Sequence, residues 1–252
     1  MKLKKVYYEE LYKLFKKPTT YALLVSFILP LFYVLSIISN SKHVVVEGNY
    51  DAVLFSSVNW NMLAMTGIPE LLFALITAHI LAYEMERGQL RNVYIRVCDR
   101  VKIILAKVAS LYTLMLVFYV TYYIFCFALY YIFIVKTNLG NGNIISETSI
   151  EFVTMDLIYL IQMVIVSNLV LLFGLYFKAF ISFGLGIGVT TTFVVVQFFP
   201  KVRYFVPVYI ATALSQHMIS SGFALILCVM YLVLSFIPIA FAIRKFSRMD
   251  IK

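Results

Sequence analysis

The sequence predicts an all-α integral membrane protein with six transmembrane helices. Of its 252 residues, 63% are hydrophobic and only 13% are charged, whereas a soluble domain is about 45–50% apolar and about 25% charged. The apolar runs are continuous and reach the length of about 20 residues that a spanning helix needs, while barrel strands would alternate apolar and polar residues. We expect spans at 19–39, 59–83, 103–135, 157–177, 179–199 and 222–243.

The segment that precedes the first span predicts an amphipathic helix. One face carries Leu3, Tyr7, Leu11, Leu14 and Phe15, and the other carries Lys5, Glu9, Lys13 and Lys16. Such a helix lies in the membrane plane, and Pro18 ends it in an elbow. Its charges exclude a cleavable signal peptide. We therefore expect an interfacial elbow helix at 1–18 and one transmembrane domain at 19–252; a simple lipid anchor is the alternative interpretation of the helix.

Lysine and arginine side chains gather on one side of the predicted membrane. If the spans alternate, 17 of the 21 lie on one side, and the others are Lys42, Lys136, Lys201 and Arg203. The positive-inside rule then places both termini in the cytoplasm. The net charge of +9 follows from this topology and from contact with anionic lipid, so it gives no reason to expect nucleic-acid binding.

The positions of the three cysteines give no sign of covalent or metal cross-links. Cys98 lies on the cytoplasmic side, and Cys126 and Cys228 lie within spans, so we expect neither a disulfide framework nor a metal cluster.

The stretch 198–222 is apolar and aromatic, is broken by prolines, and is too short for two more spans. It predicts an outer re-entrant or interfacial helical pair at 200–221.

Two features inside the predicted spans are a pair of glycines in the fifth span and a glutamate in the second. Gly184 and Gly188 have the spacing typical of close helix packing; a phosphate loop is excluded because the stretch lies within the membrane and lacks a following Lys-Ser/Thr. Glu70 follows Pro69 near the middle of the second span, where a bare carboxylate costs about 2.5 kcal/mol or more. Either it is a neutral glutamate bonded to a neighbouring Asn, Gln or Thr, or it faces a cavity, where it contacts cationic cargo or gates a pathway.

The longest charged segment, 84–107, lies between the second and third spans. Gly88 allows a bend after the second span, and Asp99 is placed to cap the third. Between them Leu90, Val93, Tyr94 and Val97 recur at helical spacing and leave Arg91, Asn92, Ile95 and Arg96 outward. The pattern predicts a short amphipathic helix that presents a basic surface to the cytoplasm.

This pattern resembles the membrane subunits of type-2 ABC exporters, whose signature runs Glu-x-Glu-x-Gly-Thr-Leu, then Pro-x-Ser-Arg, then Lys at the third span. Here it reads Glu84-Met-Glu86-Arg-Gly88-Gln89-Leu90, then Val97-Cys98-Asp99-Arg100, then Lys107. Gln89 replaces Thr, and the Pro is missing. An elbow, six spans and an outer re-entrant pair are also similar to that family.

The resemblance implies that this segment is a coupling helix, which docks on an ATPase. The implied coupling residues are Glu84, Glu86, Arg87, Gly88, Arg91, Asn92, Ile95, Arg96, Asp99 and Arg100. The alternative is that these charges only hold a loop at the lipid surface. Because the chain has no Gly-x-x-x-x-Gly-Lys-Ser/Thr loop, we expect no cofactor on it and no enzymatic activity of its own; ATP and Mg²⁺ would bind to a partner.

The implied assembly has two ATPase subunits and a second permease, identical or homologous, in a bacterial cell membrane. Small permeases of this length resemble those that confer lantibiotic immunity or export antimicrobial or amphipathic peptides, which is an argument by analogy. An ion-coupled carrier or channel is an alternative, although Glu70 is the only ionisable residue that we place deep in a span. An intramembrane protease is a third; against it, His43, His79 and His217 form no His-Glu-x-x-His pair.

Overall fold

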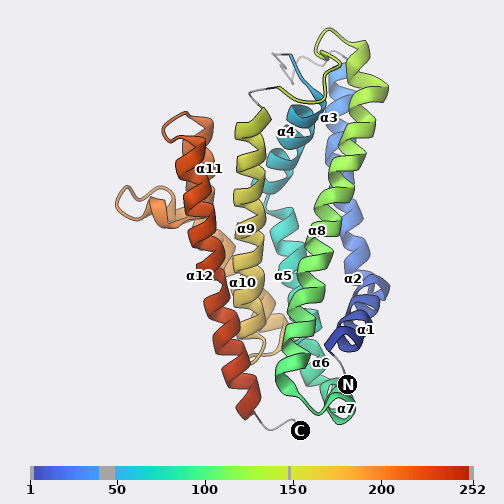
Figure 1. The fold of residues 1–252 in the computed structure, drawn as a ribbon, viewed down its shortest axis with the longest axis vertical. Coiled ribbons are helices and arrows are strands. Elements are labelled where there is room, and N and C mark those ends of the chain that lie inside the picture. Colours follow the sequence, from blue (N-terminus) through green and yellow to red (C-terminus); the bar gives the residue numbers. More distant parts are fainter. Residues whose placement is uncertain (1–2, 40–48, 147–148, 250–252) are drawn as a thin grey trace.

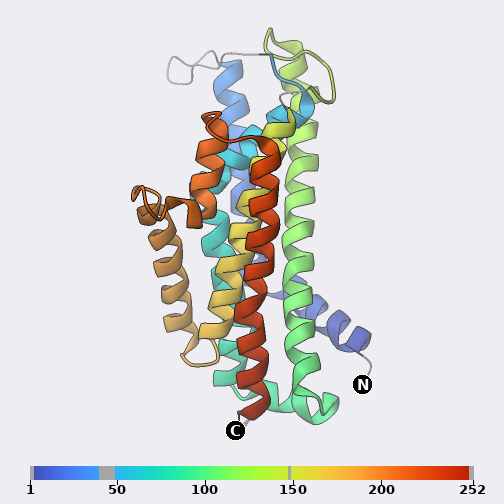
Figure 2. The same cartoon turned by 60° about the vertical axis from the view of Figure 1, so that its left-hand side comes forward.

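Six helices in the described part of the chain are long and apolar enough to cross a membrane, and they run side by side in one bundle (Figures 1 and 2). The computed structural model describes residues 3–39, 49–146 and 149–249. Lys42 and His43 lie outside these residues. The candidate spans are Pro18–Ile38, Ile68–Glu86, Arg100–Lys136, Ser149–Phe173, Ala179–Val196 and Ser221–Arg248. The predicted all-helical, six-span class is thereby confirmed.

The chain begins with α1 (Leu3–Lys16), which packs against the third span, α8 (Arg100–Phe133). The predicted apolar face of α1 is wrong in detail: its buried residues are Val6, Glu10 and Leu14, whereas Leu3 is exposed. The inward stripe is rotated because it contains a carboxylate with a partner on α8. The position of α1 in the membrane plane stays a prediction.

The first span is built from α2 (Pro18–Tyr21), the 3-10 helix η1 (Ala22–Phe27) and α3 (Ile28–Ile38). Pro18 occupies the first turn of α2, where its missing N–H leaves no hydrogen bond unmade. The last turn of the third span continues into the 3-10 helix η2 (Ile134–Lys136). The third span is the longest element of the bundle: α8 has 34 residues, about 50 Å at about 1.5 Å per residue.

The stretch predicted as the second span, 59–83, is interrupted: α4 (Ala52–Met65) precedes the candidate span, which is formed by α5 (Ile68–Ile80) and α6 (Ala82–Glu86), and the three helices follow one another along the bundle. Pro69 has no backbone N–H to donate and therefore predicts a kink at that residue, but the break lies at Gly67, which has the left-handed φ of 71° that favours glycine. Pro69 then stands in the first turn of α5, where proline is tolerated. The break brings the carboxyl end of α4 and the amino end of α5 together beside Glu70.

The aromatic core lies between the first, second and third spans. Trp60 of α4 is fully buried, and its ring lies 4.9 Å from that of Tyr119 and 5.6 Å from that of Tyr122. Such tilted aromatic contacts add to the stabilisation that burial alone supplies. The fourth span, α9 (Ser149–Phe173), packs against α4, α5 and the last span, α12 (Ser221–Arg248), and so occupies the centre of the bundle.

The fifth span, α10 (Ala179–Val196), packs on α5 and α9 through one glycine. The close approach predicted at Gly184 and Gly188 is made by Gly186: a Cβ there would lie 2.5 Å from Val170 and 3.2 Å from Ala74, whereas one at Gly184 or Gly188 would meet nothing within 4 Å. Positions two residues apart lie on nearly opposite sides of a helix, so within this chain the predicted pair points away from the packed face.

The predicted outer helical pair is one α-helix, α11 (Pro207–Ser215), and a single 3-10 turn, η3 (Arg203–Phe205). α11 lies beside the upper part of α12 in Figure 1, away from the chain termini. Its Tyr209 and Ile210 are buried, and the helix packs on α9. The Arg203 guanidinium lies 4.6 Å from the centre of the Tyr209 ring, a cation–π contact that anchors η3 to α11.

The predicted topology is testable at this end of the bundle. In a variant without native cysteines, single cysteines at the exposed positions Tyr204 and Gln216 should react with an impermeant maleimide applied to intact cells. A cysteine at Ile95, at the opposite end, should react only after permeabilisation. Mass shift on denaturing gels measures both. Labelling of position 204 or 216 only after permeabilisation would contradict the six-span topology.

Candidate functional site

A short helix, α7 (Gln89–Val97), connects α6 to α8 at the end of the bundle where both termini lie (Figure 1). A left-handed residue stands at each end of it, Gly88 with φ of 66° and Cys98 with φ of 54°. Glycine adopts this backbone conformation without strain, whereas Cys98, which has a Cβ atom, adopts it at a cost in conformational free energy. The two tight turns fix the direction of α7 relative to the spans on either side.

The amphipathic pattern predicted for α7 is confirmed. Leu90, Val93 and Val97 are buried in a cluster that includes Val6 of α1 and Ile103 of α8. The opposite face is exposed and consists of Arg91, Asn92, Ile95 and Arg96. Apolar burial therefore holds α7 in place and leaves one basic face without cover from the described chain.

Asp99 and Arg100 follow α7 and have structural contacts. Asp99 caps α8, as predicted, because its carboxylate accepts a hydrogen bond of 3.2 Å from the backbone N–H of Lys102. The Arg100 guanidinium donates to the backbone oxygens of Ser247 at 2.9 Å and Met249 at 2.5 Å. Arg100 thus ties the start of α8 to the end of α12, Asp99 caps α8, and neither residue is part of the free basic face.

Residues at the end of α6 are also engaged within the chain. The Glu86 carboxylate accepts a hydrogen bond from the backbone N–H of Ala179, at the amino end of α10, where a negative charge is favourable. The Arg87 guanidinium lies 4.5 Å from the centre of the Tyr83 ring. Ten residues are implied by the resemblance. The exposed face of α7 therefore brings together four of them, which are Arg91, Asn92, Ile95 and Arg96.

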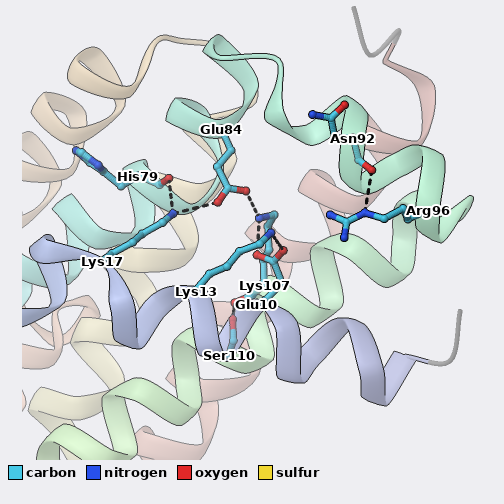
Figure 3. Close-up of polar contacts among 9 residues, drawn as sticks. All are labelled: Glu10, Lys13, Lys17, His79, Glu84, Asn92, Arg96, Lys107 and Ser110. Atoms are coloured by element: carbon cyan, nitrogen blue, oxygen red, sulfur yellow. Dashed lines mark hydrogen bonds and ion pairs between the residues drawn. The ribbon is translucent and has the colours of Figure 1, made fainter.

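Behind α7 lies a group of five charged side chains, Glu10, Lys13, Lys17, Glu84 and Lys107, which we call the buried ion-pair cluster (Figure 3). Lys107 is fully buried, and its ammonium nitrogen lies 2.7 Å from Glu10 Oε2 and 2.5 Å from Glu84 Oε2. Lys13 binds Glu10 Oε1 at 2.7 Å, and Lys17 binds Glu84 Oε1 at 3.0 Å. Each of the four carboxylate oxygens thus has an ammonium partner, with Lys107 serving two of them, and α1, α6 and α8 are joined.

The surroundings of Glu10 favour its ionised form. Burial raises the pKa of Glu10, but the ammonium groups of Lys107 and Lys13 and the hydrogen bonds that they donate outweigh it and lower the pKa from 4.5 to about 2. The stabilisation from this carboxylate is present above its unfolded pKa and is lost as the pH falls toward 2. Glu10 therefore keeps its negative charge, and its ion pairs with Lys107 and Lys13, at physiological pH.

Sequence reasoning misses this cluster. Glu84 is expected among the coupling residues, yet it points inward, and Glu10 is not singled out at all. The available signal is Lys107, a single charge inside a long apolar run, because a charge within a span needs a partner. Its partners are 97 and 23 residues away, a separation that local patterns cannot bridge.

A second polar site lies at the break between α4 and α5, where a cavity of about 250 Å³ is bounded also by α9, α10 and α11. Glu70 lines it and is only 3% exposed. The Gln162 side-chain amide on α9 donates a hydrogen bond to Glu70 Oε1. Glu70 Oε2 and Gln162 Oε1 have no hydrogen-bond partner among the described residues. Glu70 thus combines features of both predicted interpretations: it is bonded to a glutamine and it faces a cavity.

Besides Glu70, Asp156 is a carboxylate buried inside a candidate span, so the expectation that Glu70 alone lies deep in a span is wrong. The fourth span begins at Ser149, earlier than predicted, and therefore includes Asp156. Asp156 Oδ2 accepts hydrogen bonds from the hydroxyls of Ser57 and Tyr123, and Oδ1 accepts one of 3.1 Å from Asn61. Both of its oxygens are engaged, whereas one oxygen of Glu70 is free.

The fold and these sites define a class: a multi-pass helical membrane protein with a braced amphipathic helix at one end and an acidic cavity inside the bundle. No protein-family model and no curated protein matches the chain.

Proposed function

We propose that this chain is the transmembrane permease subunit of an ATP-driven exporter and that α7 is the helix on which a separate ATPase subunit acts. The observation that carries the proposal is the division of α7 into a buried apolar face and a free basic face. A loop that only kept charges at the lipid surface would need no buried anchor, whereas a helix that transmits force needs one. The four exposed residues offer an acidic partner several charge-assisted contacts.

The surroundings of α7 support transmission into the bundle. α7 joins the second span through Gly88 and the third through Cys98, and the buried ion-pair cluster links those spans by Lys107 and Glu84. A push on α7 therefore moves α6, α8 and α1 together. Above α6 the helix breaks again at Leu81, whose φ is −114°, and irregular helix ends of this kind absorb hinge motion. A movement of α6 would reach the Glu70 cavity through α5, the helix that precedes α6 and carries Glu70.

The proposed cargo is a hydrophobic or amphipathic molecule, with an antimicrobial peptide as the favoured case. An apolar groove of about 470 Å³ lies between α8, α9 and α12 and is lined by Met115, Leu160, Val164, Leu232 and Phe236, among others. A groove of this chemistry accepts apolar side chains from the bilayer. The complete exporter would contain an ABC ATPase dimer and a second permease subunit in a bacterial plasma membrane, with both termini in the cytoplasm.

Co-purification tests the proposal. The tagged chain is isolated from its own cells in a mild detergent, and associated proteins are identified by mass spectrometry. We expect a stoichiometric subunit that has a Gly-x-x-x-x-Gly-Lys-Ser/Thr loop and hydrolyses ATP. Isolation of the chain alone, in a detergent that preserves other membrane complexes of the same cells, would count against the proposal.

An ion-coupled carrier or channel is the second candidate, and the two buried carboxylates Glu70 and Asp156 favour it, since ionisable residues inside spans often mark ion pathways. Liposomes that contain only the purified chain separate the two functions. A carrier or channel moves solute or ions down an imposed gradient without ATP, whereas the permease of an ATP-driven exporter is expected to show no such flux.

A further inference from the structure

We infer that the Glu70 cavity is a binding site for a primary ammonium group, such as the lysine side chain or the amino terminus of a cationic peptide. As a statement about cargo, the inference rests on the proposed exporter function. As a statement about ligand binding, it stands on the cavity alone.

The number and kind of free acceptors match this ligand. Glu70 Oε2 and Gln162 Oε1 are buried without a partner among the described residues, and Thr190 lines the same cavity. The Thr190 hydroxyl donates to the backbone oxygen of Gly186 at 3.2 Å and also interacts with the Glu70 carboxyl group; its oxygen keeps lone pairs that can accept. A primary ammonium group has three N–H donors and no acceptor, so these three oxygens offer one acceptor to each donor.

The existing hydrogen bond orients the site. Because a carboxylate only accepts, the amide nitrogen of Gln162 must face Glu70 Oε1, as it does, and the amide oxygen must turn away from it. The hydrogen bond that Gln162 donates to Glu70 therefore fixes the direction of the Gln162 amide oxygen, which is the free acceptor. Glu70 also stands in the first turn of α5, where the positive end of the helix favours the ionised carboxylate.

Glu70 has no cationic partner among the described residues that line the cavity. The other lining residues are Ala64, Met65, Gly67, Tyr159, Val194, Gln197, Val208 and Thr212, and these described residues include no lysine, arginine or histidine. Glu10, Glu84 and Asp156 all have partners for both oxygens, so Glu70 differs from the other buried carboxylates described here. A buried carboxylate without a partner is costly, and a bound cation offsets that cost.

The shape of the site favours an organic ammonium over a metal ion. Ca²⁺ requires 6–8 oxygen ligands and Mg²⁺ a near-octahedral set, whereas three free side-chain acceptors are present, and no group of three or more metal-binding side chains occurs among the described residues. The cavity is also larger than an ion needs, at about 250 Å³. Its walls at Met65, Val194 and Val208 suit an alkyl stem behind the charged head.

A cysteine placed in the cavity wall tests the inference. In the purified chain, freed of native cysteines, Val194→Cys is treated with 2-aminoethyl methanethiosulfonate, its trimethylammonium analogue and neutral methyl methanethiosulfonate. We expect the primary ammonium reagent to react fastest, relative to its rate with a free thiol. We also expect hexylamine to slow the modification by about tenfold, the size of effect that one charge-assisted hydrogen bond supplies, while hexanol and hexyltrimethylammonium leave it unchanged.

Two variants sharpen the result. Glu70→Gln should abolish the protection by hexylamine, whereas Asp156→Asn, which neutralises a buried carboxylate with both oxygens engaged, should retain it. Equal rates for the two cationic reagents, absence of protection, protection that survives Glu70→Gln, or a cysteine that no reagent reaches would each overturn the inference. If Glu70→Gln does not fold, the comparison of the three competitors on the Val194→Cys protein decides alone.

The assay also separates this inference from the proposed function, because it uses no ATPase and measures no transport. A negative result removes the ammonium site and leaves the ATPase assignment open. Protection by hexylamine, together with a co-purification that finds no ATPase subunit, would retain the site and count against the exporter.

Discussion

Replacing Lys107 with methionine is expected to destabilise the chain by about 3–5 kcal/mol, the usual effect of leaving buried charges without their partner. Lys107 is fully buried and binds both Glu10 and Glu84. Methionine fills a similar volume but removes the ammonium group, so each carboxylate keeps only one peripheral lysine. The midpoint of thermal or denaturant unfolding in detergent measures the effect.

Two further variants make this result specific. Lys102→Met, five residues earlier on α8, breaks the ion pair of 2.8 Å between Lys102 and Asp99. Because that pair is accessible to solvent, the unfolding midpoint should stay nearly unchanged. Adding Glu10→Gln and Glu84→Gln to Lys107→Met should recover much of the lost stability, because the buried charges are then removed together. A Lys107→Met protein as stable as Lys102→Met would show that the cluster does not brace α1, α6 and α8.

Reversing the charge of the exposed α7 face, by Arg91→Glu with Arg96→Glu, is expected to reduce transport-coupled ATP hydrolysis at least about tenfold. Two like-charge contacts replace two favourable ones at a surface that must pair with an acidic partner. Neither arginine side chain contributes to the buried face of α7, so expression, membrane insertion and unfolding midpoint should not change. The measurement is cargo-stimulated ATPase activity of the reconstituted complex.

The matched control reverses two exposed arginines at the same end of the bundle but on α12, Arg244→Glu with Arg248→Glu. The net change in charge is identical, so a loss of activity in this variant as well would point to a general electrostatic effect. Full coupled activity in the α7 variant would contradict the docking role of Arg91 and Arg96.

Local patterns were sufficient for the number of spans and for α7. A spanning helix is set by the length of an apolar run, and the faces of α7 follow from the 3.6-residue period, which places Leu90, Val93 and Val97 inward. The cap at Asp99 is equally local, because the backbone N–H that donates to its carboxylate belongs to Lys102, three residues along the chain. These features depend on neighbours in sequence and could be predicted without a structure.

The features that could not be predicted depend on contacts between distant residues. Glu10 is buried only because Lys107 of another helix faces it. The break at Gly67 rather than at Pro69 depends on a left-handed turn that the surrounding helices accommodate. Gly186 in place of Gly184 becomes the packing position because α5 and α9 approach that side of α10.

The central claim, that α7 is the contact with an ATPase, is tested most directly by cross-linking from Ile95, whose side chain is 64% exposed. A single cysteine at this position, in a chain without native cysteines, is loaded with a photoreactive maleimide and irradiated in native membranes. We predict a cross-link to a subunit that contains a Gly-x-x-x-x-Gly-Lys-Ser/Thr loop. The same probe at Ile124 of α8, which is 63% exposed, should give none to that subunit. Absence of this product at position 95, or its equal yield from position 124, would contradict the claim.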